Sequence, residues 1–204
     1  MSIDELVADI LAKTPSKWIK KDQEKIFELI PDLKKCVGFD QKSKWHPYDV
    51  FEHTMHVIDN TPMALNVRFA ALFHDLGKVY TFVVDENGVG HFPEHYIKSL
   101  EIFNEFAKKH DLEKKFSKSF VDSIKVLILY HDKKFDKDEQ ALSDLINKIG
   151  GYNAVALIML KKADLLAQSE EYHYLLDEYD QQLNSLMGIA SKTDNKEISY
   201  KRYK

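Results

Sequence analysis

The sequence predicts an all-α fold, a helical bundle with one short β-hairpin. Apolar residues recur at helical spacing through most of the 204-residue chain, and proline, serine or threonine precedes several of these stretches. One stretch, 79–84, is rich in β-branched and aromatic residues, and Asn87-Gly88 after it is typical of a hairpin turn. The pattern therefore indicates helices nearly throughout and a single small hairpin.

The predicted helices can be placed in order from their capping residues and prolines. Ser2 and Glu5 form a capping box that opens the first helix, and Pro31 ends the second. Pro93 opens the helix after the hairpin, and Gly150-Gly151 separates two later helices. The predicted ranges are about 2–13, 14–30, 49–59, 61–75, 93–106, 118–131, 140–149, 152–168 and 171–187.

The composition predicts one domain, residues 1–190, followed by a basic polar tail, residues 191–204. Seven glycines and five prolines leave little material for a linker, and 44% hydrophobic residues suffice for one sizeable core. The tail has little to bury. We interpret it as a solvated end, with contact to a phosphate backbone as the alternative.

Charge, cysteine content and hydropathy restrict the functional class. The net charge of −4 argues against broad coating of nucleic acid. The only cysteine, Cys36, has no partner for an internal disulfide, which favours a reducing, cytoplasmic setting. The N-terminus does not resemble a signal peptide and the apolar runs are shorter than a membrane span, so no membrane partner is expected.

The dipeptide His74-Asp75 is the clearest functional signal. It ends an apolar helical stretch, and Gly77 and Lys78 follow it, where a helix can stop and a cation can face the solvent or a phosphate. Burying a charged side chain is costly unless it is paired or metal-bound. Two strong metal ligands side by side at the end of an apolar helix therefore predict a metal site.

Other histidines and aspartates lie on or at the ends of apolar helices. Asp164 stands in a helix whose inward positions are otherwise aliphatic, and His53 shares a helix face with Asp49 and His56. A hydrogen-bonded core histidine or a buried salt bridge is the alternative for each of them. The candidates are His46, His53, His56, His74, Asp75, His91, His95, His131, Asp132 and Asp164.

Several of these residues lie in motifs that resemble the HD superfamily of metal-dependent phosphohydrolases. The segments with this resemblance are Glu52–Thr54, His74–Lys78, Tyr130–Asp132 and Lys162–Ala167. Within the superfamily, segments 46–54, 68–78 and 91–95 are most similar to the HD domain of bacterial tRNA nucleotidyltransferases, here expected to stand alone. The resemblance covers about residues 28–170 and implies an HD-domain helical bundle.

The resemblance implies roles for individual residues. Its ordered H…HD…D pattern would hold a metal, and two further histidines would bind a second metal or a phosphate. Lys78 would meet phosphate oxygens, and with Asp75 it is expected to be catalytic. The implied metal ligands are His53, His74, Asp75 and Asp164, with His95 and His131 for the second metal or phosphate. His56 is expected to be structural, and His46, His91 and Glu52 to support the ligands at most.

The expected activity is hydrolysis of a nucleotide phosphomonoester or a 2′,3′-cyclic phosphodiester by a metal-activated water. The cofactor would be one or two divalent transition metals, Mn, Fe, Co, Ni or Zn. The partner would be a small phosphorylated substrate, with an RNA 3′ end as a further candidate; the sequence leaves the oligomeric state open. Two alternatives remain: an HD-fold di-iron oxygenase, and a non-catalytic, metal-stabilised module that binds RNA or a protein.

Overall fold

The computed structural model describes the chain except residues 135–137 and 202–204, with side chains described through residue 189. Helices dominate it, and the only paired strands in this described part form a two-residue antiparallel hairpin. The fold is therefore the predicted all-α one with a short hairpin. Its first elements are α1 (Ile3–Ile10), α2 (Pro15–Lys21), α3 (Gln23–Leu29), α4 (Pro31–Lys35), α5 (Val50–Asn60), α6 (Leu65–Phe73) and α7 (Lys78–Thr81).

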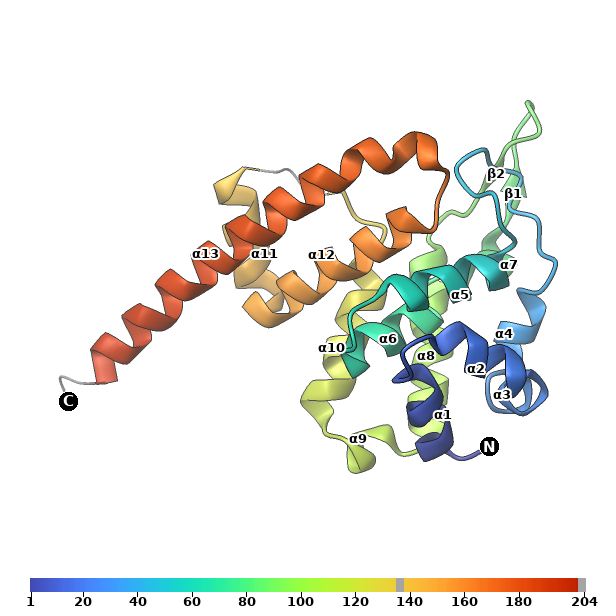
Figure 1. Ribbon diagram of the computed structural model, residues 1–204, viewed down its shortest axis with the longest axis horizontal. Coiled ribbons are helices and arrows are strands. Elements are labelled where there is room, and N and C mark those ends of the chain that lie inside the picture. The colour runs from blue at the N-terminus through green and yellow to red at the C-terminus, as the bar shows by residue number, and fades with distance from the viewer. Residues whose placement is uncertain (135–137, 202–204) are drawn as a thin grey trace.

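The second half of the chain starts with the hairpin and continues in longer helices. Its elements are β1 (Val83–Val84), β2 (Gly90–His91), α8 (His95–Lys109), α9 (Leu112–Lys115), α10 (Lys118–Tyr130), α11 (Glu139–Ile149), α12 (Gly151–Leu166), the 3-10 helix η1 (Glu170–Leu175) and α13 (Leu176–Lys201). Helix α13 runs beside α12 and extends away from the body of the molecule (Figure 1).

Helix α6 lies at the centre of the core. Every residue from Asn66 to Phe73 is buried, and α5, α8, α10 and α12 pack around this helix. The N-terminal helices α1–α4 lie on the side of the molecule opposite α13 (Figure 1). A helix that is buried on every face has neighbours on every side, which explains why the end of α6 is a meeting point of several helices.

Capping residues explain several helix boundaries and correct one prediction. The backbone N–H of Glu5 donates to Ser2 Oγ over 3.2 Å and the backbone N–H of Ser2 donates to the Glu5 carboxylate over 2.6 Å, which confirms the predicted capping box. The prediction that the fourth helix starts at about Thr61 is wrong. The Thr61 hydroxyl donates instead to the carbonyl of Ile58 and so closes α5, and α6 begins only at Leu65.

The predicted strand and the predicted second helix are each shorter than expected. Residues 78–81 form the helical turn α7, and only Val83 and Val84 of the expected strand pair with β2. Both valines are exposed, so β1 buries no side chain that would favour a longer ladder. The stretch 14–30 is divided into α2 and α3 at Asp22, whose backbone leaves the helical region.

The predicted tail and the single cysteine lie in different environments. Backbone of residues 191–201 continues α13, since no proline interrupts it, and the side chains of the tail lie outside the described residues. Cys36 is buried and its thiol is free; burial and the nearby carboxylates of Asp75 and Asp32 keep it protonated. No helix in the described part of the chain is both long enough and apolar enough to cross a membrane.

Candidate metal centre

Six predicted ligands from distant parts of the chain meet at the ends of the core helices. His53 lies within α5, His74 and Asp75 directly follow α6, and Asp164 lies in the last turn of α12. His95 begins α8 and His131 follows α10. Because these helices all pack against α6 or against its neighbours, their polar ends converge although the residues span more than half the sequence.

One group of donors surrounds the Oδ2 atom of Asp75. His53 Nε2 lies 3.4 Å from this oxygen and 3.0 Å from Asp164 Oδ1. His74 Nε2 lies 3.3 Å from the same Asp75 oxygen. The donor atoms of His53, His74 and Asp164 are within 4.8 Å of one another, which is a spacing that one metal ion can span.

A second group surrounds the other oxygen of the same carboxylate. His95 Nε2 lies 3.3 Å and His131 Nε2 lies 3.5 Å from Asp75 Oδ1. The two imidazole nitrogens are 3.1 Å from each other. Asp75 therefore stands between two groups, with one carboxylate oxygen facing each.

The ring orientation of these histidines is set by backbone carbonyls. The Nδ1 atom of each imidazole lies at hydrogen-bonding distance from a carbonyl oxygen, so Nδ1–H donates and the Nε2 lone pair faces the centre. The acceptors are Ala167 for His53 (3.4 Å), Ala71 for His74 (2.7 Å), Phe92 for His95 (2.9 Å) and Ile128 for His131 (2.7 Å). This is the tautomer that metal binding through Nε2 requires.

The donor set fits a divalent transition metal. His53 Nε2, His74 Nε2 and Asp164 Oδ1 are buried and make no hydrogen bond within the described part of the chain. Two ligands about 2.1 Å from one ion, at the angles of a tetrahedral or octahedral site, lie about 3.0–3.4 Å apart. The separations here, 3.0–3.5 Å, match that spacing.

Neighbouring groups of opposite charge favour the ionised forms of His53 and Asp75, although both side chains are buried. Burial opposes charging of His53, but the carboxylates of Asp164 and Asp75 outweigh it and raise the pKa of His53 to about 9. Burial also acts to raise the pKa of Asp75, yet the charges of His74 and Lys78 hold that pKa well below its usual value. Asp75 is therefore a carboxylate at neutral pH, the form that binds metal.

Lys78 supplies a cation at the wall of the site. Its ammonium lies 2.7 Å from Asp75 Oδ2, donates to Gln41 Oε1 over 2.9 Å, and sits 5.1 Å from the ring centre of Phe92. Gln41 is buried, and its Nε2 donates to the carbonyl of Tyr48 over 3.2 Å. Sequence reasoning missed Gln41 and Phe92, because an isolated glutamine in a loop and a phenylalanine beside a hairpin carry no recognisable signal.

Two glycines allow the loops to approach the centre closely. A Cβ on Gly77 would lie 2.1 Å from the carbonyl oxygen of His95, and a Cβ on Gly90 would lie 2.1 Å from that of Gln41. Gly77 has a φ of −69°, so it serves close packing, and α6 ends at Phe73, before this predicted stop. These contacts bring α8 and the hairpin against the ligands.

A cavity of about 240 Å³ opens beside the centre. It is polar, and His95, His131 and Lys78 are among the residues that line it. Its lining residues are Ser43, His46, Asp75, Lys78, Gly90, His91, Phe92, His95, His131, Asp132, Asp164 and Gln168. The cavity thus contains three of the other predicted candidates, His46, His91 and Asp132.

The remaining candidates divide into neighbours of the centre and surface residues. The ring of His46 meets that of His53 edge-on at 5.1 Å, and burial, with Lys78 nearby, lowers the pKa of His46 to about 3. His91 pairs with Asp85 at 2.8 Å on the hairpin. His56 is exposed and stacks on Tyr48 instead.

Two acidic candidates on α5 also lie outside the centre. Glu52 forms an ion pair with Lys20 over 2.6 Å, and both side chains are exposed. Asp49 caps α5 by accepting from the backbone N–H of Glu52 over 2.7 Å. Neither carboxylate is therefore available as a ligand in this arrangement.

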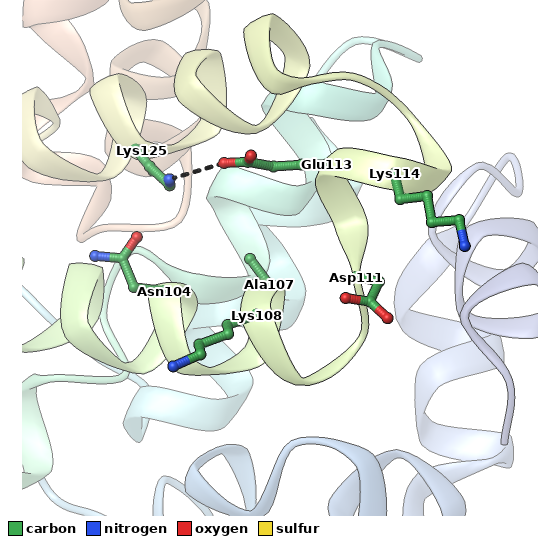
Figure 2. Close-up of a pocket in the computed structure, with 7 residues that line it drawn as sticks. All are labelled: Asn104, Ala107, Lys108, Asp111, Glu113, Lys114 and Lys125. Carbon is green, nitrogen blue, oxygen red and sulfur yellow. Dashed lines mark ion pairs between the residues drawn. The ribbon is translucent and has the colours of Figure 1, made fainter.

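A larger cavity elsewhere lacks this convergence. It measures about 370 Å³ and lies between α8, α9 and α10. Figure 2 shows Lys125 directed at Glu113, 3.7 Å away, while Lys114 points away from the other lining side chains. Size alone does not identify a functional site here, and the charges of this cavity do not meet at a point.

Comparison with known proteins agrees with the geometry. The profile of the HD domain family matches residues 46–176, the segment that contains all six converging residues. A Multifunctional CCA protein of Dechloromonas aromatica (strain RCB) is 39% identical over 83 residues, which is 38% of this chain and 20% of the relative. One of Ralstonia nicotianae (strain ATCC BAA-1114 / GMI1000) is 40% identical over 82 residues, 36% of this chain and 19% of the relative.

The relatives match a shorter part of the chain than the family profile does. The chain spans about a fifth of the length of the curated relatives that it matches. The matches therefore show similarity over one segment and not over the whole length of the relatives. The family profile, in contrast, covers well over half of the chain. The predicted resemblance is confirmed, and the chain belongs to the HD domain family.

Proposed function

We propose that residues 1–190 form one domain that hydrolyses a nucleotide phosphate ester with one or two divalent transition metals. The observation that carries this proposal is the position of Asp75, whose two carboxylate oxygens face two separate groups of donors. Membership of the HD domain family supports it. The substrate would be a phosphomonoester or a 2′,3′-cyclic phosphodiester, and an RNA 3′ end is a further candidate.

The ligands divide between two positions. His53, His74 and Asp164 would hold one metal, His95 and His131 would bind a second metal or the phosphate, and Asp75 would serve both positions. When bound, a metal of this kind lowers the pKa of a coordinated water and polarises a P–O bond. Mn, Fe, Co, Ni and Zn all accept imidazole and carboxylate ligands.

The chain's own residues would orient and stabilise the reacting phosphoryl group. The carbonyls that accept from each Nδ1–H keep the imidazoles aimed at the centre, so little reorganisation accompanies the reaction. Lys78 would place its positive charge against the phosphoryl oxygens. Gln41 holds the ammonium at the cavity wall, while Phe92 covers it.

The test measures turnover and metal content together. We expect the purified protein to contain a divalent metal and to hydrolyse a 2′,3′-cyclic nucleotide or a 5′-mononucleotide when Mn, Co, Ni or Zn is added. Removal of metal with a chelator should stop turnover, and its return should restore it. A protein that binds metal but hydrolyses neither substrate with any of these metals would contradict the proposal and favour the oxygenase or the scaffold alternative.

A further inference from the structure

The cavity beside the centre is small, so it would enclose the phosphate end of a nucleotide rather than the whole molecule. Its volume of about 240 Å³ is below the roughly 300–1,000 Å³ of pockets that enclose a small ligand almost completely. Its lining is also mainly polar, with Lys78, His95 and His131 as the groups suited to phosphate. A nucleotide held by its phosphate at the centre would therefore place its base outside the cavity, over the rim.

The backbone of Trp45 belongs to this rim. It lies between the lining residues Ser43 and His46, and its carbonyl accepts from the backbone N–H of Ser169 over 3.0 Å, next to the lining residue Gln168. Both chain segments that border the ring thus also form the cavity wall. Trp45 is 43% exposed.

The indole is held in place by a buried aromatic partner. Its ring is stacked on Tyr172, with ring centres 3.4 Å apart and planes inclined by 21°. Tyr172 is buried, so the stack is anchored in the protein. The exposed part of Trp45 is the part that Tyr172 does not cover. Lys44 Nζ lies 6.0 Å from the indole centre and adds positive charge beside it.

We propose that Trp45, supported by Tyr172, is the site on which the base of the nucleotide substrate stacks. This inference rests on the proposed phosphohydrolase function. It names the side chain that would bind the base of a nucleotide substrate. A fixed, exposed aromatic ring beside a lysine is the arrangement that binds bases in single-stranded nucleic acids, since every base has a π-face. The phosphate would lie at the metal centre and the base against the indole.

A fluorescence titration tests the contact without metal or turnover. The chain has two tryptophans, so Trp18→Phe leaves Trp45 as the reporter. We expect adenosine and a 5′-mononucleotide to quench this emission saturably, and ribose 5-phosphate, which has no base, to leave it unchanged. Emission that responds equally to all three, or to none, would overturn the stacking site.

Kinetics provide the second readout. Trp45→Ala should raise KM for the 5′-mononucleotide by about 5- to 150-fold while kcat and the KM for ribose 5-phosphate stay near their original values. Trp45→Phe should retain most of the affinity, because it keeps a ring on Tyr172. An equal loss with both substrates would indicate a structural role and overturn the proposal, as would unchanged kinetics.

Trp18 supplies a matched control. It is 40% exposed and Lys21 Nζ lies 4.6 Å from its ring centre, so it resembles Trp45 in both respects. It lies on α2, which contributes nothing to the cavity lining. Trp18→Ala should leave both KM values unchanged, and a rise specific to the nucleotide in this variant would contradict the assignment to Trp45.

The two tests separate this inference from the proposed function. If the wild-type protein hydrolyses no phosphate ester, the phosphohydrolase proposal fails, and the titration with adenosine still decides whether Trp45 binds a base. If hydrolysis occurs but the nucleotide and ribose 5-phosphate respond alike to Trp45→Ala, the phosphohydrolase proposal stands and the stacking site is wrong.

Discussion

The centre has an inner half and an outer half that differ in their surroundings. The inner half consists of His53, His74 and Asp164, and the outer half of His95 and His131. Within the described chain, the inner imidazole Nε2 atoms have no hydrogen-bond partner, whereas the two outer Nε2 atoms lie 3.1 Å from each other. Both outer histidines line the cavity, while neither inner histidine does.

The difference follows from where the helices place each ligand. His53 lies one turn into α5, and His74 continues the buried α6, so neighbouring helices enclose both rings. His95 begins α8 after a left-handed residue, Glu94, and His131 ends α10, so both occupy the edge of the bundle. We infer that the inner half retains metal and that the outer half meets the substrate.

The largest effect is expected from the residue that both halves share. Asp75→Ala removes the carboxylate that contacts all four histidines of the centre. We expect no detectable hydrolysis and loss of metal from both positions, measured by turnover and by elemental analysis. Glu52→Ala, a change on the exposed face of α5, is the control. Full activity of Asp75→Ala would contradict the proposed mechanism.

A pair of histidine variants separates the halves directly. His53→Ala should release the inner metal and reduce turnover to background. His131→Ala should keep the inner metal and lower turnover by about 100- to 1,000-fold, the loss typical of one stabilising group. The metal content per chain distinguishes the two, and His56→Ala on the same helix is the control. Equal metal loss in both histidine variants would show that the halves are not distinct.

Lys78→Ala should slow hydrolysis without removing metal. The ammonium is a charge at the cavity wall and not a ligand, so we expect turnover to fall by about 100- to 1,000-fold. Metal content should remain that of the wild-type protein. Loss of metal in this variant would mean that Lys78 supports the ionised state of Asp75 more than it supports the substrate.

Gln41→Ala should have a smaller effect than Lys78→Ala. Its Oε1 accepts from the Lys78 ammonium, so its loss misplaces the charge without removing it. Supporting residues of this kind typically contribute about 10- to 100-fold. Combined with Lys78→Ala, the Gln41 change should add no further loss of turnover, and additive losses would place Gln41 in a separate role.

A separate effect is expected on stability rather than on turnover, and it applies to the protein freed of metal. The pKa of His53 rises from 6.5 to about 9 in the folded state, which corresponds to roughly 3 kcal/mol. A raised pKa stabilises the fold fully below the unfolded value, so this contribution should be lost as pH rises from about 6.5 through 9. Urea unfolding of the metal-free protein at several pH values measures the free energy of unfolding. In the control variant His53→Ala, this part of the pH dependence should be absent.

Metal should abolish this pH dependence, because His53 must be neutral to bind it. The same unfolding series with metal added is therefore expected to show no comparable decline between neutral and alkaline pH. A decline of equal size with and without metal would indicate that His53 is not a ligand of the inner half.

The fold class followed from local patterns, whereas several boundaries did not. Helical periodicity and caps such as Ser2 act within a few residues, so they are visible along the sequence. Thr61 was misassigned because its hydroxyl can either accept from a backbone N–H that follows it or donate to a carbonyl that precedes it, and in the structure it donates to Ile58. The strand expected at 79–84 is shorter because residues 78–81 form a helical turn that packs against α8.

The sequence by itself determined which residue types are available for the centre. His74-Asp75 follows an apolar helix, and Asp164 lies in an aliphatic one. Such groups are costly to bury alone, so the sequence itself indicates that they have a partner or a metal. Their order along the chain also carried the family resemblance. Convergence of His53, His95 and His131 with them could be expected only through that resemblance.

Only the tertiary structure decided how these residues are arranged and what surrounds them. The two-sided position of Asp75, the contact of Gln41 with Lys78 and the stack of Trp45 on Tyr172 all join segments that are far apart in sequence. Such contacts depend on the packing of whole helices around α6 and on the direction in which loops leave them. A pattern along one chain records the local spacing of residues, and side-chain directions across distant segments are set only when the core has formed.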